Sequence, residues 1–355
     1  MASSLLSGIY HLYDLFQAIR GANPTFLTPH HVPGTDLTGK WIIISGSNSG
    51  IGLEAAKSFA TWGANLILAC REPASWELHP TAAVQECKFL ADAHGHSRSV
   101  IEWWEIDMAD LASVEAFCRR WLDSGRGLDV LCNNAGVVST SKTHMTRDGF
   151  QLVHQVNFLS HVLLTLRLLP SLARSPEPRV ICTTSCVHHL GELDLEHFNC
   201  GPDMHGGDYG NNKLYFQMWV SELQSRFLKH REYMHITING VHPGYVVTGI
   251  WKSVNEAEDT SGRWLKTLSR YIGITAQQGS LAITHAATSP ELGPDPKTQS
   301  VGVVGGGGGG RYINRIWEAA PKFYCHDLQA RKRLWVKLDE ELQLREKGLL
   351  TILGL

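Results

Sequence analysis

The chain has 355 residues, of which 43% are hydrophobic and 19% are charged, a composition that is typical of a globular protein and excludes wholesale disorder. The formal net charge of -2 supplies no basic stripe, so we expect no nucleic-acid partner. The eight cysteines include no Cys-x-x-Cys pair. Cys70, Cys132 and Cys182 lie in apolar runs, which predicts buried free thiols in a reducing compartment.

Residues 1–37 are predicted to form an amphipathic helix and a linker. Leu5, Ile9, Leu12, Phe16 and Ile19 recur at helical spacing, so one face of residues 3–20 is apolar. That face either packs on the rest of the protein or contacts a membrane surface, and the helix lacks the Lys-rich face that favours anionic lipid. The start of the chain lacks the early Lys or Arg of a secretory signal, and no apolar run reaches about 18 residues. We therefore expect a cytoplasmic protein, associated at most with a membrane surface and not secreted.

From residue 38 to residue 324, apolar runs alternate with helical patterns. We predict strands at 41–44, 65–69, 100–106, 128–132, 179–183, 235–241 and 311–314, and helices at 54–62, 111–122, 150–172, 209–228 and 275–288. Continuous apolar strands that alternate with helices indicate a single doubly wound parallel α/β sheet with helices on both faces and right-handed crossovers. Residues 325–355 are predicted to be a C-terminal helical extension, with a helix at 328–342. The six consecutive glycines at 305–310 are interpreted as a surface loop rather than a functional cradle.

A glycine-rich turn follows the first predicted strand. Gly46, Gly50 and Gly52 are spaced Gly-x-x-x-Gly-x-Gly between a strand and a helix. Glycines at such a turn let the backbone approach a pyrophosphate, and the helix N-terminus offers free N–H groups. The segment therefore predicts a dinucleotide site formed by Gly46, Ser47, Asn48, Ser49, Gly50, Ile51 and Gly52, although three glycines alone are also compatible with an ordinary turn.

Further cofactor contacts are predicted at the ends of later strands. Arg71 follows the second strand, where a guanidinium would pair with a 2′-phosphate, which favours NADP(H) over NAD(H). Asp107 closes the third strand and either meets the adenine ring or caps the next helix. The remaining predicted contacts follow the fourth and sixth strands: Asn133, Ala135, Gly136, Pro243, Gly244, Val246 and Thr248, the last on the nicotinamide carboxamide. Tyr209 and Lys213, on the helix at 209–228, are also predicted to contact the cofactor.

Four residues are predicted to carry the chemistry. Tyr209 and Lys213 are four apart on a helix and so share a face, and Ser185 follows the fifth strand. Hydride transfer changes the charge on a substrate oxygen, so Tyr209 would be general acid in reduction and base in oxidation. Lys213 would lower the pKa of Tyr209 and hold the nicotinamide ribose, while Ser185 would hold the substrate oxygen. Asn157, a polar residue in an apolar helix, would anchor a water in a proton relay to Lys213.

In this order, the motifs resemble the short-chain dehydrogenase/reductase family over residues 38–315. The nearest resemblance is to the retinol dehydrogenase and WW-domain oxidoreductase branch, through Ala-Cys-Arg at 69–71, Thr-Arg-Asp-Gly-Phe at 146–150, Val-Asn-Phe-Leu-Ser-His at 156–161 and Ser-Cys-Val-His-His at 185–189. The resemblance implies a Rossmann-type fold, NADP(H) and a lipophilic substrate. Ser45 stands where the family usually has Thr, and Asn212 where Ser is common. The glycine run and the N-terminal extension are not family features.

Residues 249–274 should form an apolar substrate lid, which suits a retinoid, a steroid, a fatty carbonyl or a secondary-metabolite ketone. His188 and His189 lack the further ligands of a metal site, so no metal is expected. The alternative functions are a dinucleotide-binding regulatory protein without catalysis and a sugar-nucleotide epimerase, although epimerases prefer a Gly-x-x-Gly-x-x-Gly loop. A homodimer is a further expectation.

Overall fold

The computed structural model describes residues 2–73, 79–138, 144–199, 208–246, 273–294 and 308–350. Within them, eight strands form one sheet in the order β3-β2-β1-β4-β5-β6-β7-β8, in which only the β7–β8 pair is antiparallel. The strands are β1 Trp41–Ser45, β2 Asn65–Cys70, β3 Ile101–Glu105, β4 Val130–Asn133, β5 Arg179–Thr183, β6 Thr237–His242, β7 Tyr312–Asn314 and β8 Trp317–Ala319. The predicted Rossmann-type parallel sheet is confirmed.

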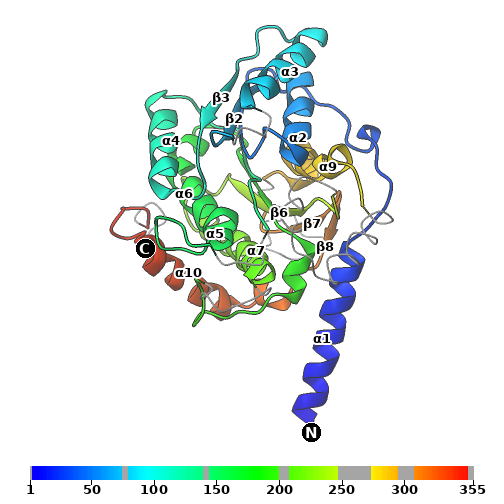
Figure 1. Ribbon diagram of the computed structural model, residues 1–355, viewed down its shortest axis with the longest axis vertical. Coiled ribbons are helices and arrows are strands. Elements are labelled where there is room, and N and C mark those ends of the chain that lie inside the picture. Colours follow the sequence, from blue (N-terminus) through cyan, green and yellow to red (C-terminus); the bar gives the residue numbers. More distant parts are fainter. Residues whose placement is uncertain are drawn as a thin grey trace.

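Helices cover both faces of this sheet (Figure 1). One apolar core joins the sheet to α2 Gly50–Thr61, α3 Pro80–Ala93 and α9 Ala276–Thr288. The other joins it to α4 Leu111–Asp123, α6 Ser160–Leu172, α7 Asp208–Phe227 and α10 Leu328–Leu342. Helix α3 was not predicted, because the residues it buries are small, as Ala83 and Ala91 are, while Phe89 is exposed.

The helix predicted at 150–172 is interrupted. It consists of α5 Leu152–His154, a π-helical turn η2 Gln155–Leu159 and α6. Such π turns are rare and change the direction of the side chains after them. The stretch Leu152–Leu172 is long and apolar enough to cross a membrane by composition, but 89% of it is buried inside the protein. It is therefore the core helix of this layer.

The order of the strands reverses at β1. Strand β1 pairs with β2 on one side and with β4 on the other, and both pairs are parallel. Helices that follow β1 and β4 leave the sheet on opposite faces, and doubly wound sheets bind their ligands beyond the carboxyl ends of such strands. The fold thus places the segments after β1, β4 and β5 at one edge.

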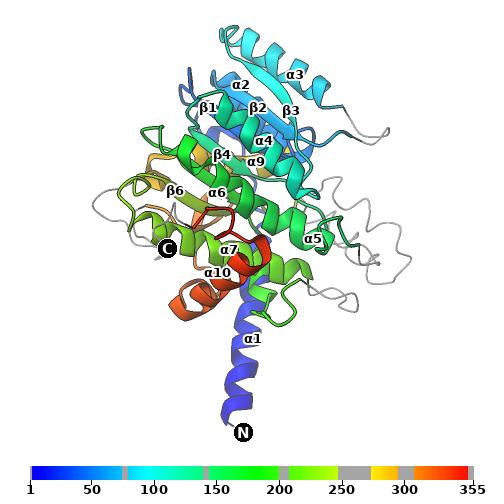
Figure 2. The ribbon, with the colours of Figure 1, turned by 90° about the vertical axis from the view of Figure 1, so that its left-hand side faces the viewer.

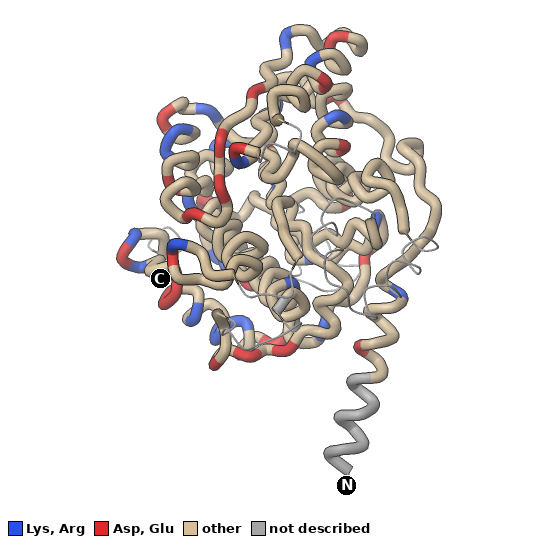
Figure 3. The backbone as a smooth tube through the Cα atoms, in the orientation of Figure 1, with Lys and Arg blue, Asp and Glu red and all other residues tan. Residues whose placement is uncertain are grey.

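The N-terminal helix α1 Ala2–Gly21 projects from the body, and its C-terminal end reaches the short helix η3 Cys186–Leu190 (Figures 1 and 2). The segment after α1 is packed rather than loose, because Leu27 and Val32 are buried against Leu281 of α9. Acidic and basic residues are interspersed along the periphery of the described chain (Figure 3).

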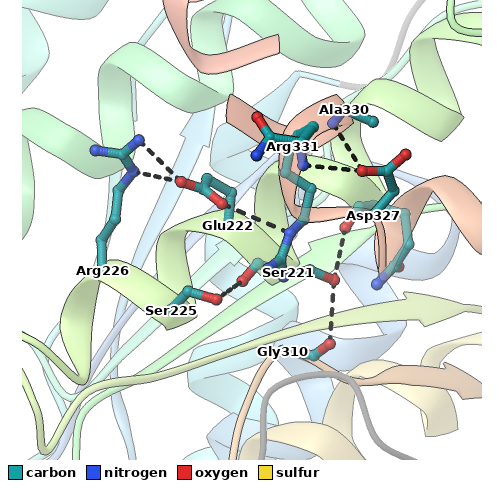
Figure 4. A network of polar contacts seen from close by, with 10 residues as sticks. Ser221, Glu222, Ser225, Arg226, Gly310, Asp327, Ala330 and Arg331 are labelled. Carbon is teal, nitrogen blue, oxygen red and sulfur yellow. Dashed lines mark hydrogen bonds and ion pairs between the residues drawn. The ribbon is translucent and has the colours of Figure 1, made fainter. Parts of the chain in front are cut away.

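The C-terminal helix α10 packs on α7. A buried ion network joins them, in which Glu222 contacts Arg226 at 2.8 Å and Arg331 at 3.6 Å (Figure 4). The interpretation of the glycine run as a surface loop is wrong for residues 308–310, which are buried. The Gly310 amide donates to Ile238 at 2.7 Å, and a Cβ on Gly309 would collide with the Gln224 side chain. Close packing against β6 and α7, rather than flexibility, requires glycine there. Residues 305–307 lie outside the described residues.

Candidate active site

The turn between β1 and α2 is built for close approach of a ligand backbone. Gly46 has a φ of +64° and Gly50 a φ of +59°, a region that favours glycine. A Cβ on Gly52 would collide with the carbonyl oxygen of Gly46 and with the Asn134 amide. The N-cap residue Ser49 makes no side-chain capping bond, so it leaves the first N–H groups of α2 for an anion. These features fit the pyrophosphate of a dinucleotide.

Two residues that the sequence analysis did not assign hold this turn. The Ser45 hydroxyl accepts from the backbone amides of Asn134 and Ala135 at 2.9 and 3.0 Å. The Asn134 amide group donates to the carbonyls of Ser45 and Gly46 at 2.9 and 3.2 Å. The side chain of Asn133 points the other way, into the core, where its amide donates to Thr165 at 2.7 Å. Alternation of side chains along a strand was the signal that separates the two asparagines.

The residues predicted near the adenosine lie after β2 and β3. Arg71 is exposed, and its guanidinium donates to the Glu72 carbonyl at 3.2 Å. Behind it, Cys70 Sγ accepts from the Ser47 amide at 3.3 Å, which ties β2 to the glycine turn. Asp107 accepts from the Ala109 amide at 2.8 Å. The alternative that Asp107 caps α4 is wrong, because Asp110 is the capping residue.

The structure brings Ser185, Tyr209 and Lys213 together. Ser185 follows β5, and its hydroxyl hydrogen-bonds the phenol of Tyr209 on α7. One turn further along α7, the Lys213 ammonium lies 5.6 Å from the centre of the Tyr209 ring. It donates to the Thr183 carbonyl at 2.7 Å. A phenol, a small hydroxyl and an ammonium therefore converge beside the carboxyl end of β5.

The pKa shifts of this cluster differ from the expectation. Burial raises the pKa of Tyr209 to about 12, partly offset by the hydrogen bond from Ser185. Burial lowers the pKa of Lys213 to about 8. We expected the ammonium to lower the pKa of Tyr209, but it is directed at the Thr183 carbonyl, and desolvation sets the direction of the shift. The phenol is accordingly protonated near neutral pH and suited to donate a proton.

Asn157 lies in the π turn and holds the chain after β4. Its Oδ1 accepts from the Val137 amide and its Nδ2 donates to the Val137 carbonyl, both at 2.7 Å. The side chain is fully buried, and its carbonyl oxygen lies close to Gly136. His161 adds a second contact to this segment, at 2.8 Å from the Ala135 carbonyl. The role of Asn157 in a water relay to Lys213 stays a prediction.

The turn after β6 returns the chain towards the glycine turn. Val246 is buried and forms a parallel bridge with Ile274. The side chains of Val246 and Ile51 both pack closely against Gly279, where a Cβ would collide with them. The turn that contains Pro243 and Gly244 therefore leads to a residue that lies near the start of α2. Thr248 and the lid residues 249–272 lie outside the described residues.

The comparison with protein families decides what this site belongs to. The family described as short chain dehydrogenase matches residues 40–259, which contain β1 to β6 and all three residues of the cluster. The chain belongs to the short-chain dehydrogenase family. This short-chain dehydrogenase is a dinucleotide-dependent oxidoreductase of the retinol dehydrogenase-like branch.

Curated relatives span most of this short-chain dehydrogenase. Human retinol dehydrogenase 11 is 31% identical over 257 residues, 72% of the chain and 75% of the relative. The chicken WW domain-containing oxidoreductase is 32% identical and covers 89% of the chain and 70% of the relative. Mouse polyprenol dehydrogenase is 29% identical, and the match covers 92% of this chain and 89% of the relative.

Two solved structures support the fold of the short-chain dehydrogenase. An uncharacterised protein from Mycobacterium paratuberculosis superposes with a TM-score of 0.61 at 24% identity, covering 90% of this chain and 98% of that one. L-sorbose reductase from Gluconobacter frateurii superposes with a TM-score of 0.54 at 21% identity, covering 72% of this chain and 91% of the reductase. At these identities the likeness shows the fold alone.

Proposed function

We propose that this enzyme uses NADP(H) to interconvert an alcohol and a ketone or aldehyde on a lipophilic small molecule. The observation that carries the proposal is the convergence of Ser185, Tyr209 and Lys213 beside the carboxyl end of β5. The glycine turn and the uncapped start of α2 would hold the dinucleotide, and Lys213 its ribose. When bound, the nicotinamide supplies or accepts a hydride.

The chain's own residues supply the proton chemistry. In reduction, the carbonyl carbon gains a hydride and its oxygen takes the proton of the Tyr209 hydroxyl, which gives the alcohol. Ser185 donates a hydrogen bond to that oxygen and so opposes the charge that develops on it. The raised pKa of Tyr209 keeps the proton in place until the oxygen becomes basic. Lys213 then provides the nearby positive charge that stabilises the tyrosinate until it is reprotonated.

Arg71 supports the preference for NADP(H). It follows β2 at the position where dinucleotide folds meet the ribose, and it is exposed for a phosphate. The solved relative L-sorbose reductase is described as complexed with NADPH. A guanidinium pairs with the 2′-phosphate of NADPH through charge-assisted hydrogen bonds, and NADH lacks that phosphate.

Replacing Arg71 with Ala is expected to weaken NADPH binding by about 10- to 100-fold and NADH binding little, because one charge-assisted contact is worth roughly 1.5–3 kcal/mol. Titration of both dinucleotides measures this. Arg98→Ala is the matched control, since Arg98 is exposed and precedes β3, at the opposite strand end. Equal losses for the two dinucleotides would contradict the phosphate role.

The substrate class is tested with a panel of hydrophobic ketones and aldehydes. Relatives named retinol dehydrogenase and polyprenol dehydrogenase act, by their names, on long apolar alcohols, which supports a lipophilic substrate here. Retinaldehyde, a polyprenal, a steroid ketone and a polar sugar ketone are each mixed with enzyme and NADPH, and NADPH absorbance is followed. We expect turnover of one or more apolar carbonyls. Turnover of the sugar alone contradicts the substrate class, and no turnover contradicts the activity.

We also propose that α1 contacts a membrane surface. Leu12, Phe16 and Ile19 lie on one face of the projecting helix and are 68%, 58% and 66% exposed. The opposite side meets the body, where Ala18 is buried and Asp14 pairs with Lys322 at 3.2 Å. The described part of the apolar face is thus not packed on the protein itself, and burial in a lipid interface would stabilise it.

The triple substitution of Leu12, Phe16 and Ile19 by serine is expected to release the protein from lipid vesicles in a flotation assay. Removing three large apolar side chains from an interface lowers its affinity steeply. Phe89→Ser is the matched control, because Phe89 is 72% exposed on α3, away from α1. Unchanged flotation of the triple variant would exclude this face as the contact.

A further inference from the structure

His188 lies directly behind the substrate-binding serine. It belongs to η3, which begins at the residue after Ser185, and its ring is fully buried. The His188 Nδ1 atom is 2.6 Å from the Ser185 carbonyl oxygen. Its Nε2 atom accepts from the backbone amide of Lys322 at 3.1 Å. One neutral tautomer, with the proton on Nδ1, satisfies both contacts, because a carbonyl only accepts and an amide N–H only donates.

Lys322, whose backbone amide binds His188, is itself held in place by its side chain. The Lys322 ammonium is buried and donates to the Gly191 carbonyl at 2.8 Å. It forms ion pairs with Glu192 at 3.1 Å and with Asp14 of α1 at 3.2 Å. A buried ammonium with three such partners is costly to displace, so the backbone around Lys322 is a rigid support. The imidazole of His188 therefore joins the serine peptide to a fixed point of the fold.

We infer that His188 is a positioning residue for Ser185, which sets the direction of the serine hydroxyl by holding its carbonyl. The inference rests on the proposed function, since it gives Ser185 a substrate oxygen to hold. Ser185 leaves β5 in an extended conformation, and its hydroxyl must reach Tyr209 while its peptide turns into η3. Rotation of that peptide would move the hydroxyl relative to Tyr209. Small misplacements at a reacting centre cost up to about 100-fold in rate.

The neighbouring His189 offers a matched control. Its ring packs on His188 with centroids 4.0 Å apart and is also buried. However, its Nδ1 atom has no hydrogen-bond partner among the described residues. A loss of function that came only from disturbing a buried aromatic pair would appear equally at both positions.

The test compares His188→Gln, His188→Asn and His189→Gln in the full chain. The backbone amide of residue 188 donates to the Ser185 carbonyl at 3.1 Å in every variant, so only the side-chain bond is tested. A glutamine amide reaches the position of Nε2 and keeps the Lys322 contact but loses the side-chain bond to Ser185, whereas asparagine keeps a donor at the position of Nδ1. We expect His188→Gln to lower kcat for the carbonyl about 10- to 100-fold with an unchanged Kd for NADPH. The kcat of His188→Asn should be close to that of the wild type. The kcat of His189→Gln should fall less than that of His188→Gln.

Hydrogen exchange gives a readout that does not depend on turnover. In His188→Gln, the amides of residues 186–190 should exchange faster, while those of β5 and α7 should not change. If the wild type is active and His188→Gln has the same kcat and the same hydrogen-exchange rates, the positioning role is overturned. Equal losses in all three variants also overturn it, because they indicate packing alone. A wild type that reduces no carbonyl contradicts the proposed function itself and, with it, this role.

Discussion

Replacing Tyr209 with phenylalanine is expected to lower kcat about 10²- to 10⁴-fold, the usual contribution of a positioned general acid. The substitution removes the hydroxyl that hydrogen-bonds Ser185 and keeps the ring beside Lys213. The glycine turn and the start of α2, which would hold the pyrophosphate, are unchanged by this substitution, so the Kd for NADPH should barely change. Steady-state kinetics with the best carbonyl of the panel and a fluorescence titration of NADPH measure the two effects.

Tyr215→Phe is the matched control for this variant. Tyr215 also lies on α7, and its hydroxyl donates to the Asp194 carbonyl at 2.8 Å, away from Ser185. Its loss removes one structural hydrogen bond and should leave kcat close to the wild-type value. If Tyr209→Phe keeps full turnover, the acid lies elsewhere. If wild type and variant both bind NADPH without turnover, the protein is a dinucleotide-binding regulator.

The free energy of unfolding is expected to fall steeply as the pH drops below 6.5. Five histidines among the described residues are buried, and burial lowers the pKa of each: His154 and His189 to about 4, His161 and His242 to about 3, and His188 well below its ordinary value. Above pH 6.5 they are neutral in both states and add no pH dependence. Below it, the unfolded chain binds protons that the folded chain does not, so stability is lost down to the folded pKa.

A single histidine whose pKa is lowered from 6.5 to about 4 removes about 3 kcal/mol from the free energy of unfolding as the pH falls across that window. The buried histidines together therefore change stability several times more than the loss of one ion pair would. Urea unfolding between about pH 8 and pH 4.5 measures the loss. His189→Leu removes one of these groups and should reduce the slope by close to one proton. A flat stability between pH 7 and pH 5 would contradict neutral burial of the histidines.

The main elements of the fold could be predicted because they carry strong periodicity. The strands at 41–44, 65–69 and 179–183 match β1, β2 and β5 within one residue, since continuous apolar runs mark strands buried on both faces. Strand β8 was missed because three residues at a sheet edge carry no pattern. The π turn at Asn157 was missed because one extra residue in a helical turn does not disturb an apolar run.

Residues of the candidate site could be predicted where residue type and spacing alone identify them. Glycines after a strand locate the turn between β1 and α2, and the Tyr209–Lys213 spacing locates the face of α7 that meets Ser185. The choice between Asn133 and Asn134 depends on which face of β4 each side chain occupies, and that follows from register rather than composition. The pKa of Tyr209 depends on desolvation by distant parts of the chain, which no local pattern contains.

Transfer of a label from the dinucleotide to the product shows whether the enzyme moves a hydride with Tyr209 as the acid. Wild-type enzyme is incubated with the best apolar carbonyl and NADPH that carries deuterium at the transferable position, and the alcohol is analysed by mass spectrometry. We expect deuterium on the carbinol carbon of the wild-type product and almost no alcohol from Tyr209→Phe. An alcohol without label, or an equal labelled yield from Tyr209→Phe, would contradict it.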